Sequence, residues 1–384
     1  MATLVNGNNV KLLPQEICGL ICQDSVLTRR DLSSLRTISR AFRDEAERLL
    51  YTSARLRGTR KIKSFCLSVI RKPFLAERLR QLTLFMPPQI DLEVDDLSRI
   101  TKALRLCHNL RNLSVLQDDS RAIPQITGDA VHRWILDGHS FRLKSFASSY
   151  FRPEVLLCFL KDQLSIETLT IKCKGDAGLS SAPLPMLKNL DSSAGVVQEF
   201  GLDAWHHTTI ERLQYSLIDS TDSEELSTFV ALTQFSDSLK SLSIRRKNGA
   251  DGLDIAVLIA CVAAQLPDLK FLQILDYTAK METYYVPFLP FPIMFTKIET
   301  LVIRPPTRAY TSLTEHTDIS TYRELRTNSG RRNAANRLMT ALKSLKRLVL
   351  IDKNIYEYTR TPNDGEICEH LLSAFDETQW LQVQ

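Results

Sequence analysis

The chain has 384 residues, of which 44% are hydrophobic and 24% charged, a composition typical of globular proteins that can build a large core. Its formal net charge of +5 is too small to indicate a dedicated nucleic-acid binder. Eight cysteines without a CxxC pair do not form a disulfide framework, which favours reduced thiols in an intracellular protein.

The first predicted elements lie between Leu13 and Tyr51, a stretch long enough for about three short helices. It carries more apolar side chains than three such helices can bury among themselves, so we expect something else to cover part of them. The basic run Arg55–Lys63 follows without interleaved aromatic residues, so we expect a solvated helix face there rather than a nucleic-acid contact.

From Leu79 onwards a short phrase recurs: apolar, two variable residues, apolar, one variable residue, apolar. The alternation at the end of each phrase predicts a strand with one buried face. The copies begin at Leu79, Leu110, Leu143, Ile166, Leu187 (a weaker copy), Ile210, Leu239, Leu269, Ile298 and Leu345.

Several intervals between these phrases have helical periodicity instead. They are residues 95–107, 153–164, 221–235, 254–266 and 333–345. Pro153 suits a first helical position, and Thr221 or Ser223 suits an N-cap. One strand and one helix per repeat predict a β/α solenoid with a parallel sheet, helices on its outer side and uneven curvature, because the phrases are irregularly spaced.

The most apolar run, Ile255–Ala264, is too short to cross a bilayer, which needs about 20 residues, and is interpreted as a buried helix. The N-terminus lacks the pattern of a signal peptide. We therefore expect a cytoplasmic or nuclear protein that does not bind membranes.

Two segments interrupt the alternation. Tyr284–Phe295 is apolar but contains three prolines, so it is either a loop packed over the solenoid, which we favour, or an exposed partner-binding patch. The polar stretch 305–332 contains few aliphatic residues, and its first half is predicted to be an exposed loop.

The opening stretch resembles an F-box, much as in the many F-box proteins of fungi. The resemblance rests on Leu13-Pro14-x-Glu16-Ile17, Leu20-Ile21, Asp31-Leu32, Leu35, "ISRAF" at Ile38–Phe42 and "AERLLY" at Ala46–Tyr51. The rest of the chain is loosely similar to leucine-rich-repeat F-box proteins. The resemblance implies an F-box at 11–52, a helical linker or cap at 53–78 and a divergent leucine-rich-repeat-like solenoid at 79–384.

An F-box implies a partner: the Skp adaptor of an SCF-type cullin–RING ubiquitin ligase, which would cover the apolar residues left over above. Carried over position by position, the resemblance places Leu13, Pro14, Ile17, Leu32, Leu35 and Ile38 at the adaptor interface. Phe42, Leu49 and Leu50 are expected in the module's own core or against the first repeat. The chain would then be a substrate-recognition subunit.

Nothing in the sequence predicts an active site, a cofactor or a metal. Phosphate-binding glycine motifs are absent, and the His206-His207 pair is interpreted as a surface or loop pair. Glu366, Glu369 and His370 would share one face of a helix, interpreted as solvated, and Cys18 and Cys22 as packed thiols. An enzyme with an unrecognised site at Tyr284–Arg332 is the least favoured hypothesis.

On the strand phrases, variable positions facing away from the helices collect basic residues. They are Lys172, Arg212, Arg245, Arg304 and Arg347. These side chains either keep the concave face soluble or bind an acidic or phosphorylated protein substrate, since guanidinium groups match phosphate oxygens. A scaffold that uses the solenoid independently of ubiquitin ligation is the alternative function.

Overall fold

The computed structural model describes residues 13–24, 26–86, 93–118, 135–151, 153–172, 182–202, 209–218, 220–247, 253, 255–277, 279–280, 295–305, 307–308, 327–361 and 365–383. The predictions for the proline-containing segment, except Phe295, for the polar stretch 309–326 and for the histidine pair lie outside these residues. The chain folds into two compact units, Met1–Leu143 and Lys144–Gln384. The predicted boundaries at residues 52 and 78 both fall inside the first unit.

The first unit begins with three short helices and continues with helices and parallel strands. In chain order its elements are α1 (Gln15–Cys22), α2 (Arg29–Leu35), α3 (Arg40–Leu50), β1 (Ser53–Arg57), α4 (Thr59–Arg71), α5 (Pro73–Arg78), β2 (Gln81–Met86), α6 (Val94–Leu106) and β3 (Asn112–Gln117). Strand β2 pairs in parallel with β1 on one side and β3 on the other.

Local capping explains where the first helices begin. The Thr28 hydroxyl accepts a hydrogen bond from the Asp31 amide while the Asp31 carboxylate accepts one from the Thr28 amide, which forms a capping box at the start of α2. The Ser39 hydroxyl caps α3 in a similar way by accepting from the Phe42 amide.

The second unit alternates strands and helices and ends in antiparallel strands. Its elements are β4 (Ser145–Ser148), α8 (Pro153–Leu160), β5 (Thr168–Ile171), β6 (Asn189–Ser193), α9 (Ala194–Leu202), β7 (Arg212–Ile218), α10 (Asp222–Leu232), η3 (Thr233–Phe235), β8 (Ser241–Lys247), α11 (Ile255–Gln265), β9 (Phe271–Asp276), β10 (Ala279–Lys280), β11 (Thr300–Arg304), β12 (Thr307–Arg308), α13 (Asn328–Ala341), β13 (Arg347–Ile351), β14 (Ile355–Arg360), β15 (Ile367–Leu372) and η4 (Gln379–Leu381).

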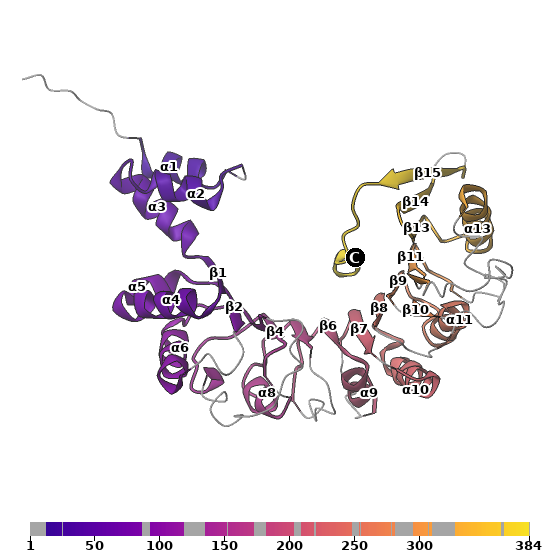
Figure 1. The fold of residues 1–384 in the computed structure, drawn as a ribbon, viewed down its shortest axis with the longest axis horizontal. Coiled ribbons are helices and arrows are strands. Elements are labelled where there is room, and N and C mark those ends of the chain that lie inside the picture. The colour runs from indigo at the N-terminus through magenta and orange to yellow at the C-terminus, as the bar shows by residue number, and fades with distance from the viewer. Residues whose placement is uncertain are drawn as a thin grey trace, which may run out of the picture. The chain divides into compact units, whose positions relative to one another are not determined.

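Strands β4 to β9, β11 and β13 of this unit form one parallel sheet in that order, and β14 and β15 extend it as antiparallel strands. Strands β10 and β12 form a separate parallel pair. The helices of the unit cover the outer side of the curved sheet, and the chain end after β15 lies on its inner side (Figure 1). The mixed α/β architecture with a mostly parallel sheet is therefore confirmed.

The recurring phrase places the strands correctly, because each of its ten copies coincides with one of β2 to β9, β11 and β13. The first and second apolar residues of the phrase become core residues, as Leu239 and Leu242 show. The five helical intervals coincide with α6, α8, α10, α11 and α13, although α13 begins earlier than predicted, at Asn328, because Thr327 caps it. Thr221 is the N-cap of α10 within a capping box.

Two helix predictions are wrong. In the basic run Arg55–Lys63, residues 55–57 belong to strand β1, and only the residues from Thr59 onwards belong to helix α4. Residues 366–370 do not lie on a helix, because Ile367–Leu372 is strand β15, paired with β14 over its whole length. Glu369 and His370 therefore point to opposite faces of the sheet, since successive side chains alternate along a strand. The pairing partner of β15 is β14, the preceding strand of the hairpin. Neither strand contains the six-residue phrase.

Candidate protein-interaction surfaces

Helices α1 to α3 build a small core around cysteine and aromatic side chains. Cys18, Cys22, Phe42 and Ala46 are buried together, and Leu32, Leu35, Ala41 and Leu49 pack against them half-buried. Cys18 and Cys22 lie one turn apart, so a single face of α1 points inward. Burial raises the pKa of the Cys22 thiol, with smaller contributions from Glu45 and Cys18, so this thiol stays protonated at neutral pH.

The same helices and the segments beside them leave other apolar side chains in solvent. We define the N-terminal apolar surface by its exposed members, Leu13, Ile17, Leu20, Ile21, Val26 and Ile38. Exposed apolar residues are common one at a time, but six on a module of about forty residues make this region a candidate contact surface. Within the part of this module that the structure describes, no other segment of the chain covers these six side chains.

The predicted adaptor residues divide between these two environments. Leu13, Pro14, Ile17 and Ile38 are exposed, whereas Leu32 and Leu35 are half-buried against the module's own core. Phe42 is buried in that core and Leu49 packs against it. Leu20, Ile21 and Val26 were not among the predicted interface residues. Their helical spacing from Ile17 was the available signal for the first two.

A second surface lies on the inner face of the sheet in the second unit. Strand register places Arg212, Ser241, Phe271, Thr300 and Arg347 side by side in one row across five strands. Since side chains alternate, residues two and four positions further along each strand share that face.

The five basic residues predicted for this face are all on it. Arg212 and Arg347 stand in the row just described. Arg245 and Arg304 lie four residues further along their strands, on either side of Leu275. Lys172 follows the last residue of β5, and its Nζ lies 3.5 Å from Asp191 Oδ2.

Residues near the C-terminus of the chain occupy this face, and no motif or periodicity in the sequence predicts this. We call residues 373–383 the C-terminal segment. The Arg245 guanidinium lies 3.0 Å from a carboxylate oxygen of Glu377. Arg347 donates to the Gln379 side chain at 2.7 Å. Arg212 donates to the Val383 carbonyl at 3.0 Å. Three of the five predicted substrate-binding residues therefore contact the C-terminal segment.

Further polar contacts hold the segment to β8 and β9. The Ser241 hydroxyl donates to the Trp380 carbonyl at 2.8 Å, and the Gln273 amide donates to the Glu377 carbonyl at 3.3 Å. The Tyr277 hydroxyl donates to the Glu377 carboxylate at 2.6 Å. Burial and then this hydrogen bond raise the pKa of Tyr277 to about 12, so the phenol remains a donor at neutral pH.

An aromatic anchor completes the contact. Trp380 is only 3% exposed and packs with inner-face residues of β9, β11 and β13. Together they form the cluster Phe271, Leu275, Val302, Val349, Ile351 and Trp380, with Tyr277, Ile355, Phe375 and Val383 at its edge. The apolar part of the inner face is thus covered by a single tryptophan and its neighbours.

The basic residues around Glu377 outnumber the acids that face them. The pKa of Lys247 is lowered by burial first and then by the charges of Lys172 and Arg245, with Glu377 and Asp191 acting in the opposite direction. The Arg304 guanidinium stacks over the Tyr277 ring, 4.4 Å from its centre. This end of the inner face therefore favours anionic groups.

Behind the inner face, a buried ion triad fixes strand β8 against its neighbours. Arg246 bonds to the Glu225 carboxylate of α10, and its Nη1 lies 3.2 Å from an oxygen of Asp276 on β9. The Ser220 hydroxyl and the Leu253 amide also donate to Glu225. Because Arg246 points into the core, the adjacent Arg245 must point to the inner face.

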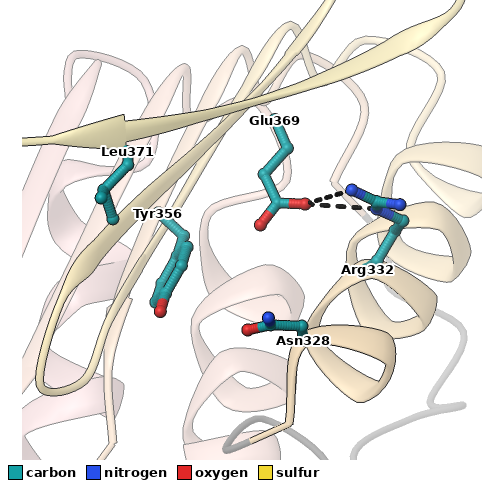
Figure 2. Close-up of a pocket in the computed structure, with 5 residues that line it drawn as sticks. All are labelled: Asn328, Arg332, Tyr356, Glu369 and Leu371. Atoms are coloured by element: carbon teal, nitrogen blue, oxygen red, sulfur yellow. Dashed lines mark hydrogen bonds and ion pairs between the residues drawn. The ribbon is translucent and has the colours of Figure 1, made fainter.

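A separate pocket lies between the start of α13 and the β14–β15 hairpin, lined by Asn328, Arg332, Tyr356, Glu369 and Leu371. Figure 2 shows Arg332 and Glu369 paired across it. Arg332 Nε and Nη2 both donate to Glu369 Oε2, at 3.2 and 2.9 Å. These two charges neutralise each other, and the remaining lining residues offer neither a base nor a nucleophile with an activating partner. Within the described parts of the chain, no three His, Cys, Asp or Glu residues are grouped so as to hold a metal ion.

Neither a protein-family model nor a curated protein matches the chain. Of the helices that the structure describes, none has the length and apolar character to cross a membrane.

Proposed function

We propose that the chain is the substrate-recognition subunit of an SCF-type cullin–RING E3 ubiquitin ligase. In this proposal α1 to α3 are an F-box that binds a Skp-family adaptor and, through it, a cullin. The strand–helix units form a divergent leucine-rich-repeat-like solenoid that binds a protein substrate, acidic or phosphorylated, on its inner face. Such a ligase subunit would work in the cytoplasm or nucleus.

The observation that carries the proposal is the N-terminal apolar surface, on the same helices whose motifs resemble an F-box. Leu13, Ile17 and Ile38 are exposed although the module has a core of its own. Burying one Leu or Ile side chain fully contributes about 1.5–3 kcal/mol, so a subunit that covers several of them gains enough for stable association. Leu32 and Leu35 contribute less, since the module already covers them in part.

The subunit would perform no bond chemistry itself. The adaptor contact fixes α1 to α3, and the inner face holds the substrate, so that substrate lysines stay near the ubiquitin thioester carried by the ligase. The rate gain then comes from a raised effective concentration and a restricted orientation. This role needs two separate binding surfaces and no catalytic residues.

A capture experiment with a Skp-family adaptor tests the proposal. We expect the wild-type chain to bind the adaptor and the triple variant Leu13→Ala, Ile17→Ala, Ile38→Ala to bind more than about 100-fold more weakly, because three apolar contacts are removed. Val230→Ala is the matched control: Val230 is 65% exposed on α10 and Ile38 is 64% exposed. Failure of the wild-type chain to bind any Skp-family adaptor would overturn the proposal.

The alternative is an interaction scaffold that uses the inner face independently of ubiquitin ligation. It is favoured by the position of the inner face, which lies entirely in the second compact unit and so does not require α1 to α3. A scaffold would bind its partner equally well in the triple variant. It would also leave the partner's cellular half-life unchanged when the proteasome is inhibited, whereas a ligase substrate would accumulate.

A further inference from the structure

We propose that the C-terminal segment is a displaceable occupant of a peptide-binding site on the inner face. The partner is an acidic peptide with a carboxylate three residues before a bulky aromatic side chain, in the spacing of Glu377 and Trp380. This inference rests on the part of the proposed function that assigns substrate binding to the inner face. It adds the chemistry of the ligand and a competitor built into the chain.

The first argument is the composition of the inner face, which changes along the sheet. On β7 and β8 it carries polar side chains, and Gln214, Ser243 and Gln273 form a hydrogen-bonded row that continues to β9. On β9, β11 and β13 it carries Phe271, Val302 and Val349 instead. An apolar patch beside polar donors is typical of a binding site, and here Trp380 of the C-terminal segment fills it.

The second argument is the way the segment is held. Among its described residues one side chain, Trp380, is fully buried, while its neighbours Leu381 and Gln382 are exposed. The sheet contributes side-chain donors rather than a strand ladder: Arg212, Ser241 and Gln273 bond to backbone carbonyls of the segment. A buried aromatic anchor surrounded by polar contacts is how peptides bind to a protein surface.

These contacts define what a partner must offer. Any peptide supplies backbone carbonyls, so Arg212, Ser241 and Gln273 can donate hydrogen bonds to peptides of many different sequences. The selective contacts are two: the Glu377 carboxylate between Arg245 and Tyr277, and the Trp380 ring in the apolar cluster. A peptide with both groups in the same spacing can make the same bonds.

The third argument is charge. The segment brings one carboxylate, Glu377, to a region where Lys172, Arg245 and Lys247 act on one another. Of these, Lys172 also has Asp191 within 3.5 Å. A partner peptide with further acidic residues beside the first would meet more positive charge than the segment neutralises.

Competition within the chain sets the affinity. Because the segment follows β15 directly, its effective concentration at the site is on the order of millimolar. A partner binds only the fraction of molecules in which the segment has left, so its apparent affinity is reduced by that fraction. Loosening the segment should therefore tighten binding of a peptide added from outside.

The test uses the full-length chain and a fluorescein-labelled synthetic peptide of residues 373–384, SAFDETQWLQVQ. We expect the Trp380→Ala chain to bind this peptide at least tenfold more tightly than wild type in fluorescence anisotropy. Leu381→Ala is the matched control, since Leu381 is an exposed apolar residue of the same segment, and it should bind as wild type does. Glu377→Ala should also tighten binding, and it carries the test if Trp380→Ala fails to fold.

Peptide variants check the chemistry. With the Trp380→Ala chain, replacing the tryptophan of the peptide by alanine should reduce binding at least tenfold, and replacing its glutamate by glutamine should reduce it less. Adding Arg245→Glu to the chain should weaken the unmodified peptide as well. Equal binding of the peptide to wild-type and both opened chains would overturn the inference, as would indifference to the tryptophan. No adaptor is present, so the result does not depend on the F-box proposal.

Discussion

The buried ion triad of the second unit offers the sharpest stability test. Arg246, Glu225 and Asp276 are almost completely buried, and the two carboxylates share one guanidinium. Replacing Arg246 by methionine keeps much of the side-chain volume but leaves two buried carboxylates without a cation. Removing one partner from such a group destabilises a protein by about 3–5 kcal/mol, which corresponds to a midpoint lowered by roughly 6–20 °C in a unit of this size.

The pH dependence of this variant has a definite direction. Without Arg246, the two buried carboxylates have no cation beside them, so burial and mutual repulsion penalise their charged forms in the folded state. The variant is therefore more stable at low pH and loses stability as the pH rises, so its loss of stability relative to wild type should be larger at pH 7 than at pH 5. Thermal unfolding followed by circular dichroism at both pH values measures this difference.

A matched variant separates charge from packing. Combining Arg246→Met with Glu225→Gln and Asp276→Asn removes all three charges, so it should recover a large part of the lost stability. A deficit below about 1 kcal/mol for Arg246→Met alone would refute the reasoning, because an unpaired buried charge cannot be that harmless. An equal deficit for the single and triple variants would assign the effect to packing.

Two further predictions follow from burial and exposure. Burial raises the pKa of Cys66 and Cys107 to about 12 from 9.0. The free energy of unfolding should therefore be unaffected below pH 9 and fall between pH 9 and 12, where only the unfolded state ionises. At pH 8 iodoacetamide should label the exposed Cys158 in the folded protein and should reach Cys66 and Cys107 only in urea. Arg332→Ala should change the free energy of unfolding by less than about 1 kcal/mol, because Arg332 is 67% exposed in its pair with Glu369, and a larger loss in urea unfolding would contradict this.

Local sequence signals predict most of the parallel part of the fold. The recurring phrase works because a strand with one buried face repeats every two residues, a pattern that needs no knowledge of its neighbours. Thr221 with Glu224 could be recognised as a helix start for a similar reason, since a capping box is complete within four residues. The same alternation predicts that basic residues at the variable positions, such as Arg245, lie on the face turned away from the helices.

Other features escaped because their partners are distant in sequence. Strand β15 looked helical, and only its pairing with β14 makes it a strand. The C-terminal segment has no periodicity of its own, and its position depends on contacts such as that of Arg212 with Val383, 171 residues apart. The burial of Arg246 has no local signal either, because it depends on Glu225 and Asp276.

The amino-acid sequence by itself determined the alternation of strands and helices, the face on which each strand buries its leucines, and the apolar residues of α1 to α3, because these depend on spacing along the chain. The tertiary structure alone decided which of those apolar residues remain in solvent, and that the chain's own end lies over the basic inner face. Both depend on surfaces that meet only after folding, where Trp380 finds the apolar cluster and Glu377 finds Arg245.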